Sequence, residues 1–155
     1  MTADPFPSAP GAYVLLLALT APARLTVGRL GTFDFPPGYY TYVGSAHGPG
    51  GLAGRLKHHL APTAQPHWHI DRLRKAAAVA AVWWCADEEI REHGWAAALA
   101  NLSGGHIIAR RFGASDCHCP SHLLHFAAHP DFAAFAECAG GVIEFTELSA
   151  PGLRP

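Results

Sequence analysis

The order of apolar and polar positions predicts several strands near the start of the chain. Residues 12–19 form a continuous apolar run, which is typical of a short strand buried on both faces. Residues 24–28 alternate between polar and apolar side chains, and residues 39–43 are aromatic and β-branched, so each stretch is predicted to be a strand. Because the three strands follow one another closely, we expect them to form an antiparallel meander.

Further along the chain the apolar spacing becomes that of helices. Leu52, Leu56 and Leu60 recur at helical spacing, so we expect them on one buried helix face. Arg55 and His59 are four residues apart and would lie one above the other on the same side of that helix. The remaining pattern predicts helices over 66–75 and 87–102, and strands over 79–85, 107–109 and 142–145.

Length and composition indicate a single domain. The chain has 155 residues, of which 50% are hydrophobic and 15% charged, which is enough apolar material for one core. Residues 1–10 contain three prolines and are expected to be a disordered lead-in. The start lacks the basic segment of an export signal, and the apolar stretch 13–19 is too short to span a bilayer. We therefore expect a cytoplasmic protein with no membrane partner.

The charges are divided unevenly along the chain, although the net charge is only -1. Residues 22–75 contain seven basic and two acidic side chains, a balance of +5. Residues 76–155 contain four basic and nine acidic side chains, a balance of -5. This division permits a basic face that meets phosphates and an acidic region that supplies metal ligands.

Short motifs occur in an order that resembles the GIY-YIG nuclease superfamily. They are the strings at 11–13 and 42–44, then Arg55 and His59 on the predicted helix, then Glu92 on a later helix. Longer strings at 38–46, 67–71 and 112–123 are similar to the Uri-type branch of that superfamily.

The resemblance implies a fold and a division of the chain. The fold would be α+β, with a small three-stranded antiparallel sheet flanked by helices and one or two extra C-terminal strands. The nuclease-like domain would cover residues 11–126. Residues 127–155 would form a C-terminal extension packed on the same domain.

The resemblance also implies an endonuclease that hydrolyses a phosphodiester bond in DNA with Mg²⁺ or Mn²⁺. Tyr13 or Tyr42 would accept the proton of the attacking water, which requires a neighbouring cation or the metal to lower the pKa of the phenol. Arg55 suits the charge that develops on the phosphoryl oxygens, and His59 would orient or protonate. Glu92 would bind the metal.

A second group of polar residues is expected to contact the DNA substrate or to line its groove. It comprises Ser45, Lys57, His67, His69, Asp71, Ser115 and Asp116.

The four cysteines are expected to be thiols or metal ligands rather than disulfides. Cys117, Cys119 and His122 place three zinc-type ligands within six residues. A zinc ion held there would take its fourth ligand from His125, Cys138, His67 or His69. Otherwise the two cysteines are small packing residues.

Two other functions are compatible with the sequence. The first is a nucleic-acid-binding module that keeps the fold and a basic face but does not cut. The second is a zinc-dependent hydrolase of a small molecule, built on the 11 histidines. A protein partner or a homodimer would help a domain of nearly neutral charge to bind DNA.

Overall fold

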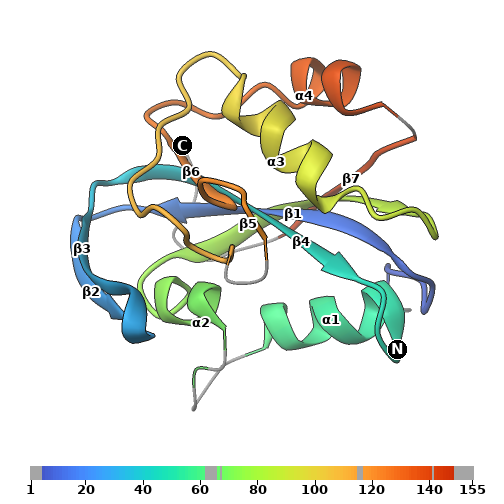
Figure 1. Ribbon diagram of the computed structural model, residues 1–155, viewed down its shortest axis with the longest axis horizontal. Coiled ribbons are helices and arrows are strands. Elements are labelled where there is room, and N and C mark those ends of the chain that lie inside the picture. Colours follow the sequence, from blue (N-terminus) through green and yellow to red (C-terminus); the bar gives the residue numbers. More distant parts are fainter. Residues whose placement is uncertain (1–4, 62–65, 67, 115–116, 141, 149–155) are drawn as a thin grey trace.

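A computed structural model gives the fold and describes residues 5–61, 66, 68–114, 117–140 and 142–148. Its centre is a five-stranded sheet in the order β6-β4-β1-β5-β7, in which all neighbours are antiparallel (Figure 1). The strands are β1 (Gly11–Leu19), β4 (Gly38–Ala46), β5 (Ala78–Ala86), β6 (Leu123–Phe126) and β7 (Glu144–Glu147). The predicted α+β class is confirmed, but the sheet has five strands rather than three.

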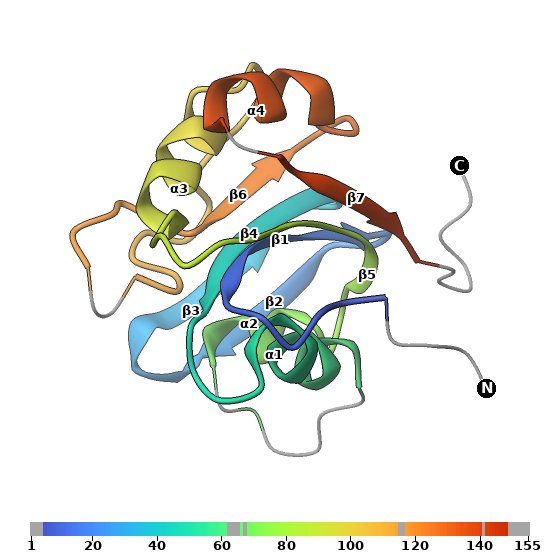
Figure 2. The same ribbon diagram turned by 90° about the vertical axis from the view of Figure 1, so that its right-hand side faces the viewer.

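Helices cover both faces of this sheet, as the two views show (Figures 1 and 2). Helices α1 (Gly51–Leu60) and α2 (His69–Leu73) lie on one face, and α3 (Glu92–Ala100) and α4 (Phe132–Ala139) on the other. The apolar run of β1 is buried because its side chains alternate between two cores. Leu15 packs in the core beneath α1, and Val14 packs with Trp83 and Trp95 in the core beneath α3.

The predicted meander is wrong in its pairing. Strand β2 (Ala23–Val27) exists but pairs with β3 (Gly31–Phe35) in a separate two-stranded sheet, while β4 pairs directly with β1. A short 3-10 helix, η1 (Gly28–Leu30), joins β2 to β3 between Gly28 at φ 49° and Gly31 at φ 127°, conformations that favour glycine. Because Val27 and Phe35 are fully buried, the hairpin folds over the core instead of extending the main sheet.

The second half of the chain contains elements that the pattern did not predict. Strand β6 and helix α4 were missed, and residues 107–109 form no strand, since the bridge there joins His106 to His125. Helix α3 begins at Glu92 rather than at 87, because Asp87 accepts hydrogen bonds from the Glu89 amide and from the Arg91 side chain in a turn. Helix α2 is limited to 69–73. The exposure of Leu60, at 38%, also shows that it does not share the buried face of α1.

The expected disorder of residues 1–10 is wrong for the part that the structure describes. Phe6 is buried, and its ring lies 5.8 Å from that of Trp84. The carbonyls of Pro7 and Ala9 accept hydrogen bonds from amides in the first turn of α1, where a helix has no internal partners. Residues 1–4 lie outside the described residues.

At the C-terminal end, α4 and β7 complete the same domain. Strand β7 lies beside β5 and pairs with it (Figure 2). Phe135 of α4 packs against Trp83 and Trp95. Among the described helices, none combines the length and apolar character required to cross a membrane.

Candidate functional site

Tyr13 and His59 form the centre of a polar cluster beneath the sheet. The Tyr13 hydroxyl lies 2.8 Å from Nε2 of His59, and each residue is 1% exposed. Tyr13 comes from β1 and His59 from the last turn of α1. Gly44 is paired with Tyr13 in β4, and a Cβ there would lie 2.3 Å from the Tyr13 hydroxyl. A glycine is therefore needed for the tyrosine ring to lie across the neighbouring strand.

Tyr42 and Arg55 complete the set of four residues expected to be catalytic. The Tyr42 ring packs at 6.3 Å from His59 and 6.0 Å from Phe112. The charge of Arg55 acts on Tyr13 and lowers its pKa, and the guanidinium carbon of Arg55 lies 4.7 Å from the centre of the Trp68 ring. The fold therefore brings Tyr13, Tyr42, Arg55 and His59 together, and Trp68 joins them although the sequence pattern did not single it out.

Burial opposes the lowering of the tyrosine pKa values that the predicted role of a base requires. Burial raises the pKa of Tyr13 and of Tyr42 well above the ordinary value, because a phenolate would lose its hydration. The charge of Arg55 lowers both values but does not outweigh burial. Without a bound metal both phenols are therefore protonated at neutral pH, and the Tyr13 hydroxyl can donate a hydrogen bond to His59.

His59 is neutral in the folded protein. Burial, followed by the charge of Arg74, lowers its pKa to about 3. Its Nδ1 atom is buried without a hydrogen-bond partner among the described residues. A neutral ring that carries its proton on Nδ1 can accept the Tyr13 hydroxyl proton in a hydrogen bond at Nε2.

This shift predicts how stability depends on pH. In the unfolded chain the imidazole of His59 has a pKa of about 6.5. Between pH ~6.5 and pH ~3 the unfolded chain therefore binds a proton that the folded chain does not bind. The stabilisation is complete above ~6.5 and is lost as pH falls, at up to about 1.4 kcal/mol per pH unit. Urea unfolding from pH 7 to pH 4 measures the slope. We expect the free energy of unfolding to depend less steeply on pH in His59→Gln, which keeps every other titrating group. Equal slopes for the variant and the unchanged protein would contradict the low pKa of His59.

Glu92 approaches the same tyrosines from the opposite face of the sheet. It is the first residue of α3, and its charge raises the pKa of both Tyr13 and Tyr42. Its side chain is 23% exposed, and Oε2 lies 3.9 Å from Nδ1 of His122. One partly exposed carboxylate fits Mg²⁺, which keeps several waters and binds through one or two carboxylates and a substrate phosphate.

The residues expected to contact substrate have different roles in the structure. Lys57 is exposed, and Ser45 hydrogen-bonds with Nδ1 of His47 at 2.6 Å. The Gly113 amide donates to Nδ1 of His69 at 2.8 Å, so His69 holds the loop beneath Tyr42. His67, Ser115 and Asp116 lie outside the described residues.

Asp71 is not available to substrate, which corrects its predicted role. It is completely buried, accepts a hydrogen bond from the Trp68 amide at 2.9 Å and lies 3.3 Å from both His58 and Arg74. A buried carboxylate with these partners anchors α2 to α1. It therefore supports the site by holding Trp68 and the end of α1 in place.

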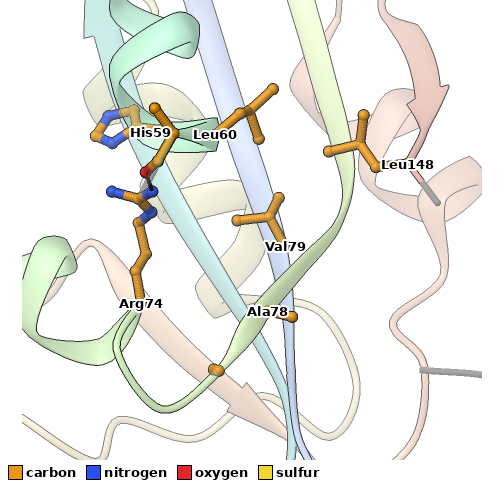
Figure 3. Close-up of a pocket in the computed structure, with 8 residues that line it drawn as sticks. His59, Leu60, Arg74, Ala78, Val79 and Leu148 are labelled. Carbon is orange, nitrogen blue, oxygen red and sulfur yellow. Dashed lines mark hydrogen bonds between the residues drawn. The ribbon is translucent and has the colours of Figure 1, made fainter. Parts of the chain in front are cut away.

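Two pockets flank α1. Arg55, His58 and Trp68 line one of about 190 Å³, together with the loop that follows β4. Figure 3 shows the other, where Leu60, Val79 and Leu148 form an apolar wall and the His59 ring is turned away from them. Arg55 is therefore the charged group of this cluster that reaches an open pocket next to the loop.

The structure brings together Cys117, Cys119 and His122, as the sequence predicts, but adds a different fourth residue. That residue is His93, in the first turn of α3, and the four ligand atoms lie within 4.8 Å of one another. The expected fourth ligands His69, His125 and Cys138 are elsewhere: His125 hydrogen-bonds with the Pro37 carbonyl, and Cys138 is exposed on α4.

A comparison with models of known protein families identifies the family of this chain. A family model described as domain of unknown function DUF123 matches residues 12–142, so the chain belongs to that family. This corrects the resemblance drawn from the short motifs, because the matching model is DUF123 and not that of the GIY-YIG nucleases. No curated protein and no solved structure matches the chain.

Proposed function

We propose that this protein is a metal-dependent endonuclease that hydrolyses a phosphodiester bond in DNA. One observation carries the proposal: Tyr13 and Tyr42 both contact His59, and Arg55 of the same helix lies over Trp68 and lines an open pocket. A cation for the phosphate and two phenols are thus brought together, and the negative charge of Glu92 acts on both phenols. This combination supports phosphoryl chemistry because each part has a role at the reacting phosphorus.

Arg55 would bind the phosphoryl oxygens. Its planar guanidinium lies over the face of Trp68, which restricts its orientation before substrate arrives. A fixed, permanently charged donor stabilises the charge that develops on those oxygens during attack.

Tyr13, Tyr42 and His59 would position the attacking water and carry its proton. The water oxygen forms a bond to phosphorus while a P–O ester bond breaks and its electron pair passes to the leaving oxygen. The water loses one proton, and the leaving oxygen gains one. The hydrogen bond from Tyr13 to the neutral His59 ring holds the phenol in one orientation, and a metal beside the phenols would lower their pKa so that a phenolate could accept the proton of the water.

Glu92 would hold the divalent metal. Bound Mg²⁺ or Mn²⁺ would supply positive charge beside the phenols and the leaving oxygen. Glu92 is better suited than the neighbouring acidic residues, because Glu88 is exposed and Glu89 pairs with Arg91 at 2.9 Å.

The unequal charge distribution supports DNA as the substrate. Residues 22–75, which include α1 and α2, carry a balance of +5. Lys57 and Lys75 in this segment are exposed and would be available to the phosphate backbone. The four free cysteines suit the reducing cytoplasm in which we propose that the protein acts.

The test is cleavage of supercoiled, branched and single-stranded DNA by the purified protein, with and without Mg²⁺ or Mn²⁺. We expect metal-dependent nicking that EDTA abolishes. Binding without cleavage on every substrate would instead support a non-catalytic nucleic-acid-binding module. RNA of the same sequence distinguishes a DNA enzyme from a general phosphodiesterase.

Trp68→Leu is expected to lower kcat/KM by about 3- to 10-fold, because a cation over an aromatic face contributes ~0.5–2 kcal/mol. The lower kcat/KM would arise because the Arg55 side chain is held less firmly, since Trp68 itself takes no part in the reaction. Trp68→Phe keeps a ring beneath the guanidinium and should recover part of the loss. Single-turnover cleavage rates make the comparison, and equal rates for Trp68→Leu and the unchanged protein would refute the role.

A further inference from the structure

We propose that His93, Cys117, Cys119 and His122 bind a zinc ion that fastens the start of α3 to the loop before β6. The four ligand atoms lie within 4.8 Å of one another. Two contacts are already at ligand-to-ligand spacing. Nδ1 of His93 lies 3.3 Å from Sγ of Cys119, and Nε2 of His122 lies 3.3 Å from Sγ of Cys117.

These distances fit a tetrahedral zinc ion. Zinc bonds of about 2.3 Å to sulfur and about 2.0–2.1 Å to nitrogen place neighbouring ligand atoms roughly 3.5–3.8 Å apart. The two nitrogen-to-sulfur distances of 3.3 Å are slightly shorter than that range, and all four ligand atoms lie within 4.8 Å of one another, so small side-chain movements would complete the tetrahedron. Two thiolates and two neutral imidazoles also form one of the usual ligand sets for structural zinc.

The second nitrogen of His122 supports the assignment independently. His122 is 3% exposed, and its Nδ1 is buried without a hydrogen-bond partner among the described residues, 3.9 Å from Oε2 of Glu92. With Nε2 directed at Cys117, Nδ1 is left to carry the proton and to face a carboxylate. Zinc-bound histidines commonly have this arrangement, because the carboxylate selects the tautomer that leaves the other nitrogen free for the metal.

The four protein ligands indicate a structural rather than a catalytic ion. A catalytic zinc keeps one position open for water or substrate, and here all four positions are filled by side chains. The small-molecule zinc hydrolase considered from the sequence is therefore not supported by this cluster.

The site would stiffen the surroundings of the proposed active site. The carbonyl of His122 accepts from the Val43 amide at 3.0 Å, and the carbonyl of Cys119 accepts from Arg111 at 2.7 Å. Gly113 in the same loop lies against Tyr42, since a Cβ there would be 2.7 Å from the tyrosine ring. Glu92 adjoins His93. An ion at this position would therefore fix both the loop beneath Tyr42 and the helix that carries Glu92.

The test is metal content, which does not depend on whether the protein cuts DNA. We expect the protein purified without chelator or metal-affinity resin to contain about one zinc per chain by mass spectrometry. Replacement by Co²⁺ should give the thiolate-to-cobalt charge-transfer band and the intense visible bands of a tetrahedral site. EDTA should lower the Tm by about 10 °C or more, as loss of a structural ion requires.

Matched variants locate the ion. Cys117→Ser, Cys119→Ser and His93→Gln should each lose zinc, whereas Cys138→Ser, at an exposed thiol on α4, should retain it. His93 is exposed, so its replacement tests the site without disturbing the core. Absence of zinc, together with no cobalt charge-transfer band on reconstitution of the unchanged protein, would overturn the proposal. Full zinc content in the Cys117→Ser, Cys119→Ser double variant would also overturn it.

Discussion

Replacing Arg55 with alanine is expected to lower metal-dependent DNA cleavage by about 100- to 1,000-fold, the usual effect of removing one donor that stabilises the transition-state charge. The loss should appear in kcat under single-turnover conditions. Such a donor must be held in place and must be accessible to substrate. Arg55 meets both requirements, since it packs over Trp68 and lines an open pocket.

Two variants serve as controls for Arg55→Ala, one at a neighbouring position of α1 and one at position 55 itself. Lys57→Ala removes an exposed charge two residues away and should change cleavage only slightly, mainly by weakening DNA binding at higher salt. Arg55→Lys keeps the charge but loses the planar fork, and should restore little activity. Cleavage by Arg55→Ala at the rate of Lys57→Ala would refute the assignment.

Replacing Glu92 with glutamine is expected to lower cleavage by about 100-fold or more and to raise the metal concentration needed for half-maximal activity. The side chain keeps its size, so the fold and the neighbouring helix start should be preserved. The physical cause is the loss of the negative oxygen that attracts a hard cation next to Tyr13 and Tyr42.

Glu88→Gln is the matched control for this change, because it removes an exposed carboxylate four residues earlier. It should retain full activity and an unchanged metal requirement. Zinc content must be measured on Glu92→Gln as well, since Glu92 faces His122. Loss of cleavage with zinc retained indicates a role in the reaction. Unchanged cleavage at all metal concentrations would exclude Glu92 as the metal ligand.

Local sequence pattern predicted those elements whose structure depends on near neighbours. The apolar run of β1 is a strand because both of its faces are buried, and α1 forms where Leu52 and Leu56 recur at helical spacing. The placement of Arg55 and His59 on one side of α1 follows from helix geometry alone. Residue type and helical spacing were therefore enough to predict that these two polar side chains lie together on the helix.

The pairing of strands that lie far apart in the sequence could not be predicted from local pattern. Residues 24–28 were predicted as a strand of the main sheet, but only packing decides that β1 pairs with β4, leaving β2 with β3. Strand β6 was missed because four residues with two buried faces give no alternating pattern.

The short motifs also did not identify the family to which the chain belongs. The strings that resemble GIY-YIG nucleases are brief, and the match over residues 12–142 places the chain instead in the family described as domain of unknown function DUF123. The catalytic roles proposed above therefore rest on the positions of the side chains in the fold and on the experiments that test them.

From the sequence alone came the α+β class, the chemistry available to Tyr13, Arg55, His59 and Glu92, and three of the four proposed zinc ligands, because residue type and local spacing set these features. Tertiary structure alone decided that Tyr13 meets His59 across 46 residues of chain, that burial raises the tyrosine pKa values, and that His93 joins Cys119. The physical reason is that desolvation and ligand geometry depend on which distant segments pack together, and no local periodicity carries that information.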